Sequence, residues 1–310
     1  MKYRYITADV FTDRVFGGNP LAVFPNASGL PDEQMRKIAR ELNVSETVFV
    51  FPPVDSRNTR ALRIFTPGME LPFAGHPTIG TAFILSLIGE VALDEPETSI
   101  VLEEGVGPVL VTIRASGGRP TFAQLTVAQQ PEFGDAPLVE DLAALLELTP
   151  EDVLTGTYSP QAVSCGVPFL FVTVRDRGAL ARARLRVTLW AELLADAWAP
   201  HVYVLTADAD SADYRVRMFA PAMNIVEDPA TGAAAAALAA YLGMREPGPS
   251  GTYRWTVEQG IEMGRPSMLD VEADKEHGSM TAIRVGGRAV MVAEAVMTIP
   301  ATSDQSPVAS

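Results

Sequence analysis

The chain has 310 residues, of which 47% are hydrophobic and 20% are charged, a composition that excludes a disordered or fibrous protein. The formal net charge of -14 at pH 7 argues against nucleic acid and anionic membranes as partners, since both need clustered Lys and Arg. One cysteine and three histidines are too few for a His/Cys metal cage, so we expect no metal, with a site made of carboxylates alone as an alternative that the sequence does not support.

In chain order, alternating apolar residues predict strands, and apolar residues at helical spacing predict helices. The expected elements are strands at 3–10 and 21–24, a helix at 31–42, strands at 47–51 and 61–65, a helix at 77–87, strands at 109–114 and 122–127, helices at 139–146 and 150–154, strands at 170–174 and 214–219, a helix at 229–242, and strands at 280–285 and 289–299. This order favours antiparallel sheets with few helices over a regular strand–helix alternation. The polar tail at 301–310 is expected to be frayed.

The N-terminal residues lack a basic start followed by an apolar run, so we expect no signal peptide and a chain that begins at Met1. The most apolar windows, 82–93 and 233–242, are much shorter than the ~20 residues that span a bilayer. We therefore expect a cytoplasmic protein without a membrane partner.

An internal repeat indicates a duplicated architecture. The first segment contains Arg63, Phe65, Pro67, Met69, Pro77, Gly80 and Ala82, and these recur as Arg217, Phe219, Pro221, Met223, Pro229, Gly232 and Ala234. The offset is 217 - 63 = 154 for the first four pairs and 229 - 77 = 152 for the last three. A weaker match relates 18–24 to 166–172 at an offset of 148. The repeat predicts two domains of one topology, 1–118 and 119–287, facing each other across a cleft, with 288–300 returning to the first domain and a ligand site between them.

The helices at 77–87 and 229–242 belong to this repeat, and both are apolar nearly all round, which predicts burial inside a sheet. Proline is common at the first helical position, so Pro77 and Pro229 place His76 and Asp228 at the N-caps.

The N-terminal ends of these helices are candidate sites for a carboxylate, because helix starts carry unpaired N–H groups and the positive end of the dipole. Gly75 and Gly232 allow close approach of the backbone, and Thr78 and Thr231 supply hydroxyl groups. Two such ends in one cleft predict an anionic small molecule as the ligand.

Glu46 is the candidate for proton transfer, since it lies between a helix and a strongly apolar strand, and a carboxyl in an apolar pocket can titrate near neutral pH. Each of these residues also has a purely structural interpretation. Glu46 can be a solvated loop carboxylate, Asp228 an ordinary N-cap and His76 a buried histidine with satisfied hydrogen bonds. Cys165 is expected to be a buried, inert thiol. Nucleotide, serine-hydrolase and zinc-protease motifs are absent from the sequence.

Four ordered motifs resemble the phenazine biosynthesis PhzF-like family, and the resemblance runs from about Tyr3 to Ile299. They are FGGNPLAVF at 16–24, NVSET at 43–47, FAGHPT at 73–78 and EDPATG at 227–232. The resemblance implies an α+β, diaminopimelate epimerase-like fold. In that fold two similar domains, each a barrel-like antiparallel sheet around a central helix, are related by a pseudo-twofold axis, and the protein is usually a homodimer.

The resemblance also implies a cofactor-independent isomerase that moves a proton within a small unsaturated carboxylate like trans-2,3-dihydro-3-hydroxyanthranilate. Glu46 matches the glutamate that takes the proton from the hydroxyl-bearing carbon and returns it elsewhere on the conjugated system. His76 and Asp228 match residues that line the site and act with it. The implied substrate-binding residues are Asn19, Ser45, Gly75, Thr78, Thr231, Gly232 and Ala233.

Two departures limit what the resemblance implies. Family members often have a serine where this chain has Ala233, so a substrate-contacting hydroxyl is missing. The helix starts also lack the facing thiols of two-thiol racemases, which disfavours that reaction. Two alternatives stay open: an epimerase that uses carboxylates in place of thiols, and a non-catalytic protein that binds a small molecule.

Overall fold

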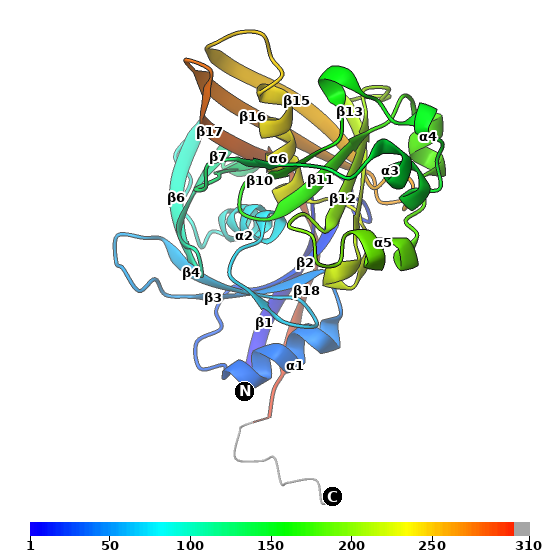
Figure 1. Ribbon diagram of the computed structural model, residues 1–310. Helices are drawn as coiled ribbons and strands as arrows, with labels where there is room; N and C mark the ends of the chain where they lie inside the picture. Colours follow the sequence, from blue (N-terminus) through cyan, green and yellow to red (C-terminus); the bar gives the residue numbers. More distant parts are fainter. Residues whose placement is uncertain (301–310) are drawn as a thin grey trace, which may run out of the picture.

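Two buried helices, α2 (Gly75–Leu87) and α6 (Gly232–Gly243), form the centres of the two halves of the molecule (Figure 1). The structure is a computed structural model and describes residues 1–300, so the expected frayed tail at 301–310 lies outside the described residues. Every residue of α2 from Gly75 to Ser86 is buried, and α6 is buried along nearly its whole length. The burial of both helices is what their apolar sequences predicted.

Strands wrap around each central helix, and the shorter helices lie outside them. The first half contains β1 (Lys2–Val10), β2 (Asn19–Phe24), α1 (Asp32–Leu42), β3 (Glu46–Phe51), β4 (Arg60–Phe65), β5 (Glu70–Leu71), β6 (Glu97–Glu104), β7 (Gly107–Ser116) and β8 (Arg119–Thr126). The second half contains β9 (Glu132–Gly134), α3 (Val139–Leu145), η1 (Pro150–Asp152), η2 (Gly156–Tyr158), β10 (Gln161–Ser164), β11 (Pro168–Thr173), α4 (Arg177–Arg182), α5 (Val187–Leu193), β12 (His201–Thr206), β13 (Tyr214–Ala220), η3 (Pro221–Met223), β14 (Ile225–Asp228), β15 (Gly251–Gln259), β16 (Ser267–Glu276) and β17 (Ser279–Gly287). The last strand is β18 (Ala289–Thr298).

The strand pairing is repeated between the halves. In the first half β1–β2 and β3–β4 are antiparallel, while β2–β3 and β4–β6 are parallel. The corresponding pairs β10–β11, β12–β13, β11–β12 and β13–β15 have the same senses. Antiparallel β6–β7–β8 likewise corresponds to β15–β16–β17. The predicted fold class is therefore confirmed, with the addition of parallel pairs beside the antiparallel ones.

Two ladders connect distant parts of the chain. Strand β17 pairs with β8, which joins the two halves into one continuous sheet. Strand β18 returns to the first half and pairs antiparallel with β1 along its whole length.

The starts of both central helices differ from the prediction. The N-cap of α2 is Ala74, so His76 lies in the first helical turn and not at the cap. The N-cap of α6 is Thr231, and Asp228 is the last residue of β14. Proline lacks only an N–H that the first turn leaves unpaired, so Pro77 fits inside the turn and does not mark its first residue.

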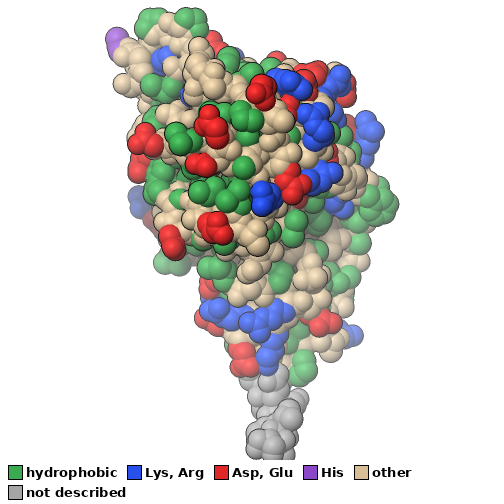
Figure 2. All heavy atoms as spheres, turned by 45° about the vertical axis from the view of Figure 1, so that its right-hand side comes forward, with side chains coloured by type: hydrophobic (Ala, Val, Ile, Leu, Met, Phe, Trp, Pro, Cys, Tyr) green, Lys and Arg blue, Asp and Glu red, His purple; other side chains and the backbone are tan. Residues whose placement is uncertain are grey.

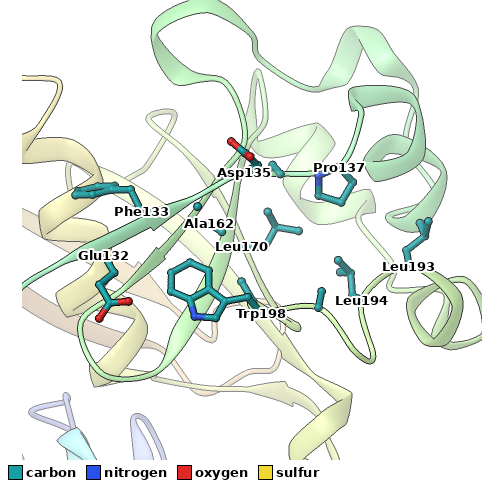
Figure 3. A pocket seen from close by; sticks show the side chains of 13 residues that line it. Glu132, Phe133, Asp135, Pro137, Ala162, Leu170, Leu193, Leu194 and Trp198 are labelled. Atoms are coloured by element: carbon teal, nitrogen blue, oxygen red, sulfur yellow. The ribbon is translucent and has the colours of Figure 1, made fainter.

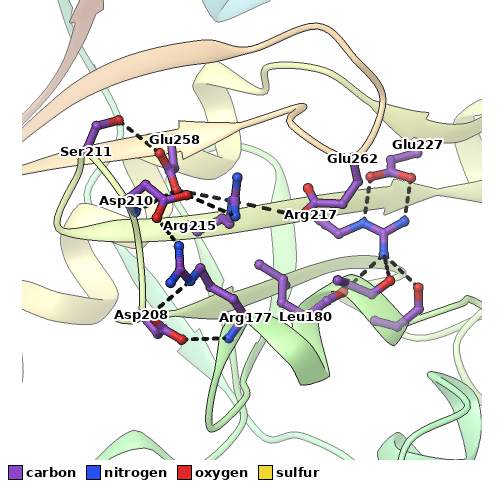
Figure 4. Close-up of polar contacts among 12 residues, drawn as sticks. Arg177, Leu180, Asp208, Asp210, Ser211, Arg215, Arg217, Glu227, Glu258 and Glu262 are labelled. Atoms are coloured by element: carbon purple, nitrogen blue, oxygen red, sulfur yellow. Dashed lines mark hydrogen bonds and ion pairs between the residues drawn. The ribbon is translucent and has the colours of Figure 1, made fainter.

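Each half contains the same arginine–glutamate fork. Arg63 on β4 donates from Nε and Nη2 to the two carboxylate oxygens of Glu70 at 2.7 Å each. Arg217 on β13 donates in the same way to Glu227 on β14 at 2.8 Å each (Figure 4). These bidentate pairs fasten the strand that precedes each central helix.

The surface carries charges of both signs. On the face shown in Figure 2, acidic and basic side chains lie close to one another at the upper right and at the lower end, and hydrophobic side chains with scattered acidic ones lie between these regions. Within residues 1–300, none of the helices is long and apolar enough to cross a membrane.

Candidate active site

The two central helices meet at their N-terminal glycines. A methyl group added to Gly75 would lie 3.3 Å from Cα of Gly232, and one added to Gly232 would lie 3.4 Å from Cα of Gly75. Only glycine permits this approach without displacing a neighbour. The two helix starts that the sequence predicted as halves of one site are therefore side by side.

Glu46 and His76 form a buried pair at this junction. Glu46 begins β3 opposite Leu21 of β2, and its Oε2 lies 3.1 Å from Nε2 of His76. Only 9% of Glu46 and 5% of His76 are exposed. Glu46 is thus not a solvated loop carboxylate.

Burial decides the charge of this pair. It raises the pKa of Glu46 to about 8, with a further contribution from the negative charge of Asp228. Burial lowers the pKa of His76 to about 3, although a hydrogen bond to the backbone of Pro20 acts in the opposite direction. At neutral pH both side chains are therefore mainly uncharged, and the contact is not a salt bridge.

The facing atoms of the pair remain available for bonding. Pro20 has only a carbonyl to offer, so a ring N–H of His76 donates to it and fixes the ring. Glu46 Oε2 and His76 Nε2 are buried, and neither has an aligned hydrogen-bond partner within residues 1–300. Because buried polar atoms are nearly always paired, this arrangement is suited to a third group that bonds to both.

Asp228 completes the group from the second half. Its Oδ1 accepts a hydrogen bond from Asn19 Nδ2 at 3.0 Å, and its Oδ2 accepts one from the Thr231 hydroxyl at 2.5 Å. Burial raises the pKa of Asp228 to about 6, against the effect of these two hydrogen bonds. Asn19 Nδ2 also donates to the carbonyl of Ala230 at 2.8 Å, so this residue of β2 links the two halves at the site.

The remaining predicted residues surround this group but differ in accessibility. The Thr78 hydroxyl is buried and lies 2.7 Å from both Ala74 O and Glu104 Oε1, so it is engaged within the protein and not free for a ligand. Ser45 and Ala233 are partly exposed and adjoin Glu46 and Gly232 in the chain.

Two buried polar residues were missed by the sequence analysis, Glu104 at the end of β6 and Gln259 at the end of β15. The Thr78 hydroxyl has one proton, and Ala74 O can only accept it. That proton is shared with Glu104 Oε1, which also accepts from the Thr78 hydroxyl, and burial raises the pKa of Glu104 to about 8 against the effect of this hydrogen bond. Neither strand was predicted, and an extension of the repeat to an offset of 259 - 104 = 155 was the signal that could have revealed both residues.

The raised pKa values predict a stability that falls with pH. Glu46 and Glu104 hold their protons in the folded state up to about pH 8, whereas the pKa of each carboxyl in the unfolded chain is about 4.5. Their stabilising contribution is complete below about pH 4.5 and is lost as the pH rises through about 8. The lowered pKa values of His76 and His201 have the opposite effect on stability, but only below about pH 6.5. Above that pH both histidines are neutral in the folded and in the unfolded state.

We therefore expect the free energy of unfolding to decrease from about pH 6.5 to about pH 8.5, by at most ~1.4 kcal/mol per pH unit for each carboxyl. Urea unfolding at several pH values measures this slope. Glu104→Gln should make it shallower, and an unchanged slope in that variant would contradict the assignment.

A separate hollow lies away from this group. Its volume is about 460 Å³, and it is lined in the second half by residues that include Phe133, Leu170, Leu194 and Trp198 (Figure 3). None of the predicted site residues lines it.

Comparison with known proteins identifies the family of this chain. The family model described as "Phenazine biosynthesis-like protein" matches residues 8–295. The chain belongs to this family. A trans-2,3-dihydro-3-hydroxyanthranilate isomerase of Pseudomonas aeruginosa is 33% identical over 94% of this chain and 98% of its own length. An uncharacterised isomerase of Mesorhizobium japonicum is 38% identical over 95% of this chain and 98% of its own length.

A solved structure gives the same family for this chain. The PhzF-family protein of Bacillus anthracis superposes with a TM-score of 0.87 at 25% identity, and the alignment covers 96% of this chain and 100% of the Bacillus anthracis chain. The family match confirms the family resemblance, and the names of the two sequence relatives confirm the prediction of an isomerase.

Proposed function

We propose that this isomerase moves a proton within a small unsaturated carboxylate substrate and that Glu46 removes and returns the proton. The observation that carries the proposal is the buried pair of Glu46 Oε2 and His76 Nε2, 3.1 Å apart and without other partners within residues 1–300, beside Asp228 at the meeting point of two helix starts. The name of the Pseudomonas aeruginosa relative supports a substrate like trans-2,3-dihydro-3-hydroxyanthranilate.

The geometry supports a proton transfer that needs only one acid–base group. With a pKa of about 8, roughly a tenth of Glu46 is ionised at pH 7, and this form accepts a proton from the hydroxyl-bearing carbon. The proton on the Glu46 carboxyl exchanges with solvent, and neutral Glu46 then donates a proton to another carbon of the conjugated system. In this transfer one C–H bond breaks, one C–H bond forms and the double bonds shift. The resulting enol then loses its O–H proton and gains a proton at carbon to become a ketone.

The neighbouring groups have supporting roles in this proposal. Neutral His76 is fixed by Pro20 and directs Nε2 toward the Glu46 carboxyl. Asp228 is held by Asn19 and Thr231 and is suited to bind a donor group of the substrate. The N–H groups and positive dipole ends at Gly75 and Gly232 favour the substrate carboxylate.

Turnover in heavy water tests the proposal. The enzyme is incubated with trans-2,3-dihydro-3-hydroxyanthranilate and with a panel of cyclic and acyclic unsaturated amino and hydroxy acids. NMR and mass spectrometry should show a shifted double bond with deuterium at the newly protonated carbon of at least one compound. Inversion of a stereocentre without a double-bond shift would instead indicate an epimerase. Binding without exchange across the panel would indicate a non-catalytic protein, and either result would overturn the proposal.

A further inference from the structure

The duplication brings Glu104 and Gln259 to equivalent places. In the parallel pair β4–β6, Ala61 lies opposite Glu103, and in β13–β15, Arg215 lies opposite Glu258. The next residue along each strand, Glu104 or Gln259, is its last and lies beside the start of the central helix of its half. The two halves thus hold a carboxyl and an amide at corresponding positions.

Gln259 uses its full hydrogen-bonding capacity. Its Nε2 donates to the carbonyl of Asp228 at 2.8 Å and to the Thr231 hydroxyl oxygen at 3.1 Å. Its Oε1 accepts from the backbone N–H of Thr231 and from the Tyr203 hydroxyl, both at 3.2 Å. The side chain is 0% exposed, so water cannot replace any of these contacts.

These contacts have a fixed direction. The Thr231 hydroxyl receives an N–H from Gln259, and its single proton is therefore directed to Asp228 Oδ2 at 2.5 Å. A carboxyl at position 259 has at most one proton and faces two acceptors, so it cannot reproduce this pattern. The chain of donors from Gln259 through Thr231 to Asp228 requires an amide.

We propose that Gln259 is a positioning residue that holds Asp228 as a hydrogen-bond acceptor through Thr231, and this inference rests on the proposed function of the site. The other groups facing Asp228 are Asn19 from β2, Glu46 from β3 and Tyr203 from β12, with His76 from α2 behind Glu46. Of these, Asn19 already donates to Oδ1, so the donor to Oδ2 is the one that Gln259 controls.

The first half contains a matched control. There the Thr78 hydroxyl donates to Ala74 O of its own helix and to Glu104 Oε1. Glutamine at position 104 offers the same acceptor oxygen from a group of the same shape. The two substitutions are the reverse of each other and involve side chains of the same size. We expect Glu104→Gln to preserve the local structure and Gln259→Glu to disrupt it.

The test measures the titration of Asp228 by NMR in protein labelled with ¹³C at the aspartate side-chain carboxyls, with Asp228→Asn used to assign the signal. Gln259→Glu should raise the titration midpoint by about one pH unit or more, because a second carboxyl approaches and the donor to Oδ2 is lost. Glu104→Gln should shift it by less than about 0.3 units. A midpoint in Gln259→Glu that equals that of the wild type would overturn the inference.

Thr231→Val provides a second route if Gln259→Glu does not fold. It removes the relaying hydroxyl while keeping the shape of the side chain, and it should raise the same midpoint. An unchanged midpoint would again overturn the inference. This measurement needs no turnover, so its result is independent of the proposed function. A shifted midpoint in a protein without isomerase activity would refute only the proposed function. An unshifted midpoint in an active enzyme would refute only the role of Gln259.

Discussion

Glu46→Gln should lower turnover by about 10²–10⁴-fold while leaving ligand affinity within a few-fold of the wild type, because the amide keeps the shape of the side chain but cannot exchange a proton. Turnover is followed by solvent deuterium incorporation, and affinity by calorimetry with 3-hydroxyanthranilate, an aromatic carboxylate that cannot undergo the shift. The separation of the two effects identifies proton transfer as the role of Glu46.

Glu41→Gln is the matched control for this substitution. Glu41 is exposed on α1 and takes no part in the site, so the same chemical change there should leave both measurements unaltered. Equal deuterium incorporation by Glu46→Gln and the wild type would remove Glu46 from the mechanism.

Arg217→Ala should destabilise the fold by about 3–5 kcal/mol, because it leaves the half-buried Glu227 carboxylate unpaired and removes the donor to the carbonyls of Leu180 and Ala183. The side chain of Arg217 is only 5% exposed, compared with 30% for its counterpart Arg63. Arg63→Ala should therefore cost about 1 kcal/mol, since its partners can be hydrated. Urea unfolding at one pH compares the two variants, and equal losses would show that burial does not decide the strength of these forks.

Local patterns predicted the parts of the fold that depend on short-range periodicity. The apolar helices and the repeat of Arg63 at Arg217 were readable because the duplicated segment keeps its spacing. Strand β12 was missed, since it is buried on both faces and so lacks the alternation that identifies a strand. Strands β6 and β15 were missed as well, and with them Glu104 and Gln259.

The candidate site was predicted as a set of residues but not as a geometry. Glu46 reaches His76 because β3 pairs in parallel with β2, a contact between segments that no local pattern encodes. The helix starts were misplaced because proline was assigned to the first helical position, whereas Pro77 lies further inside the helix and Pro229 precedes it. The family resemblance supplied the residues, and long-range strand pairing supplied their positions.

The repeated backbone carries unlike side chains in its two halves, and this difference restricts the orientation in which a substrate can bind. The carboxyls that titrate near pH 8, Glu46 and Glu104, both lie in the first half, while Asp228 and the amide of Gln259 lie in the second. A molecule rotated by half a turn about the axis between the halves would exchange these surroundings and lose its acid–base partner. Under the proposed function, a substrate therefore has one productive orientation between the halves, the one that places its reacting carbon beside Glu46.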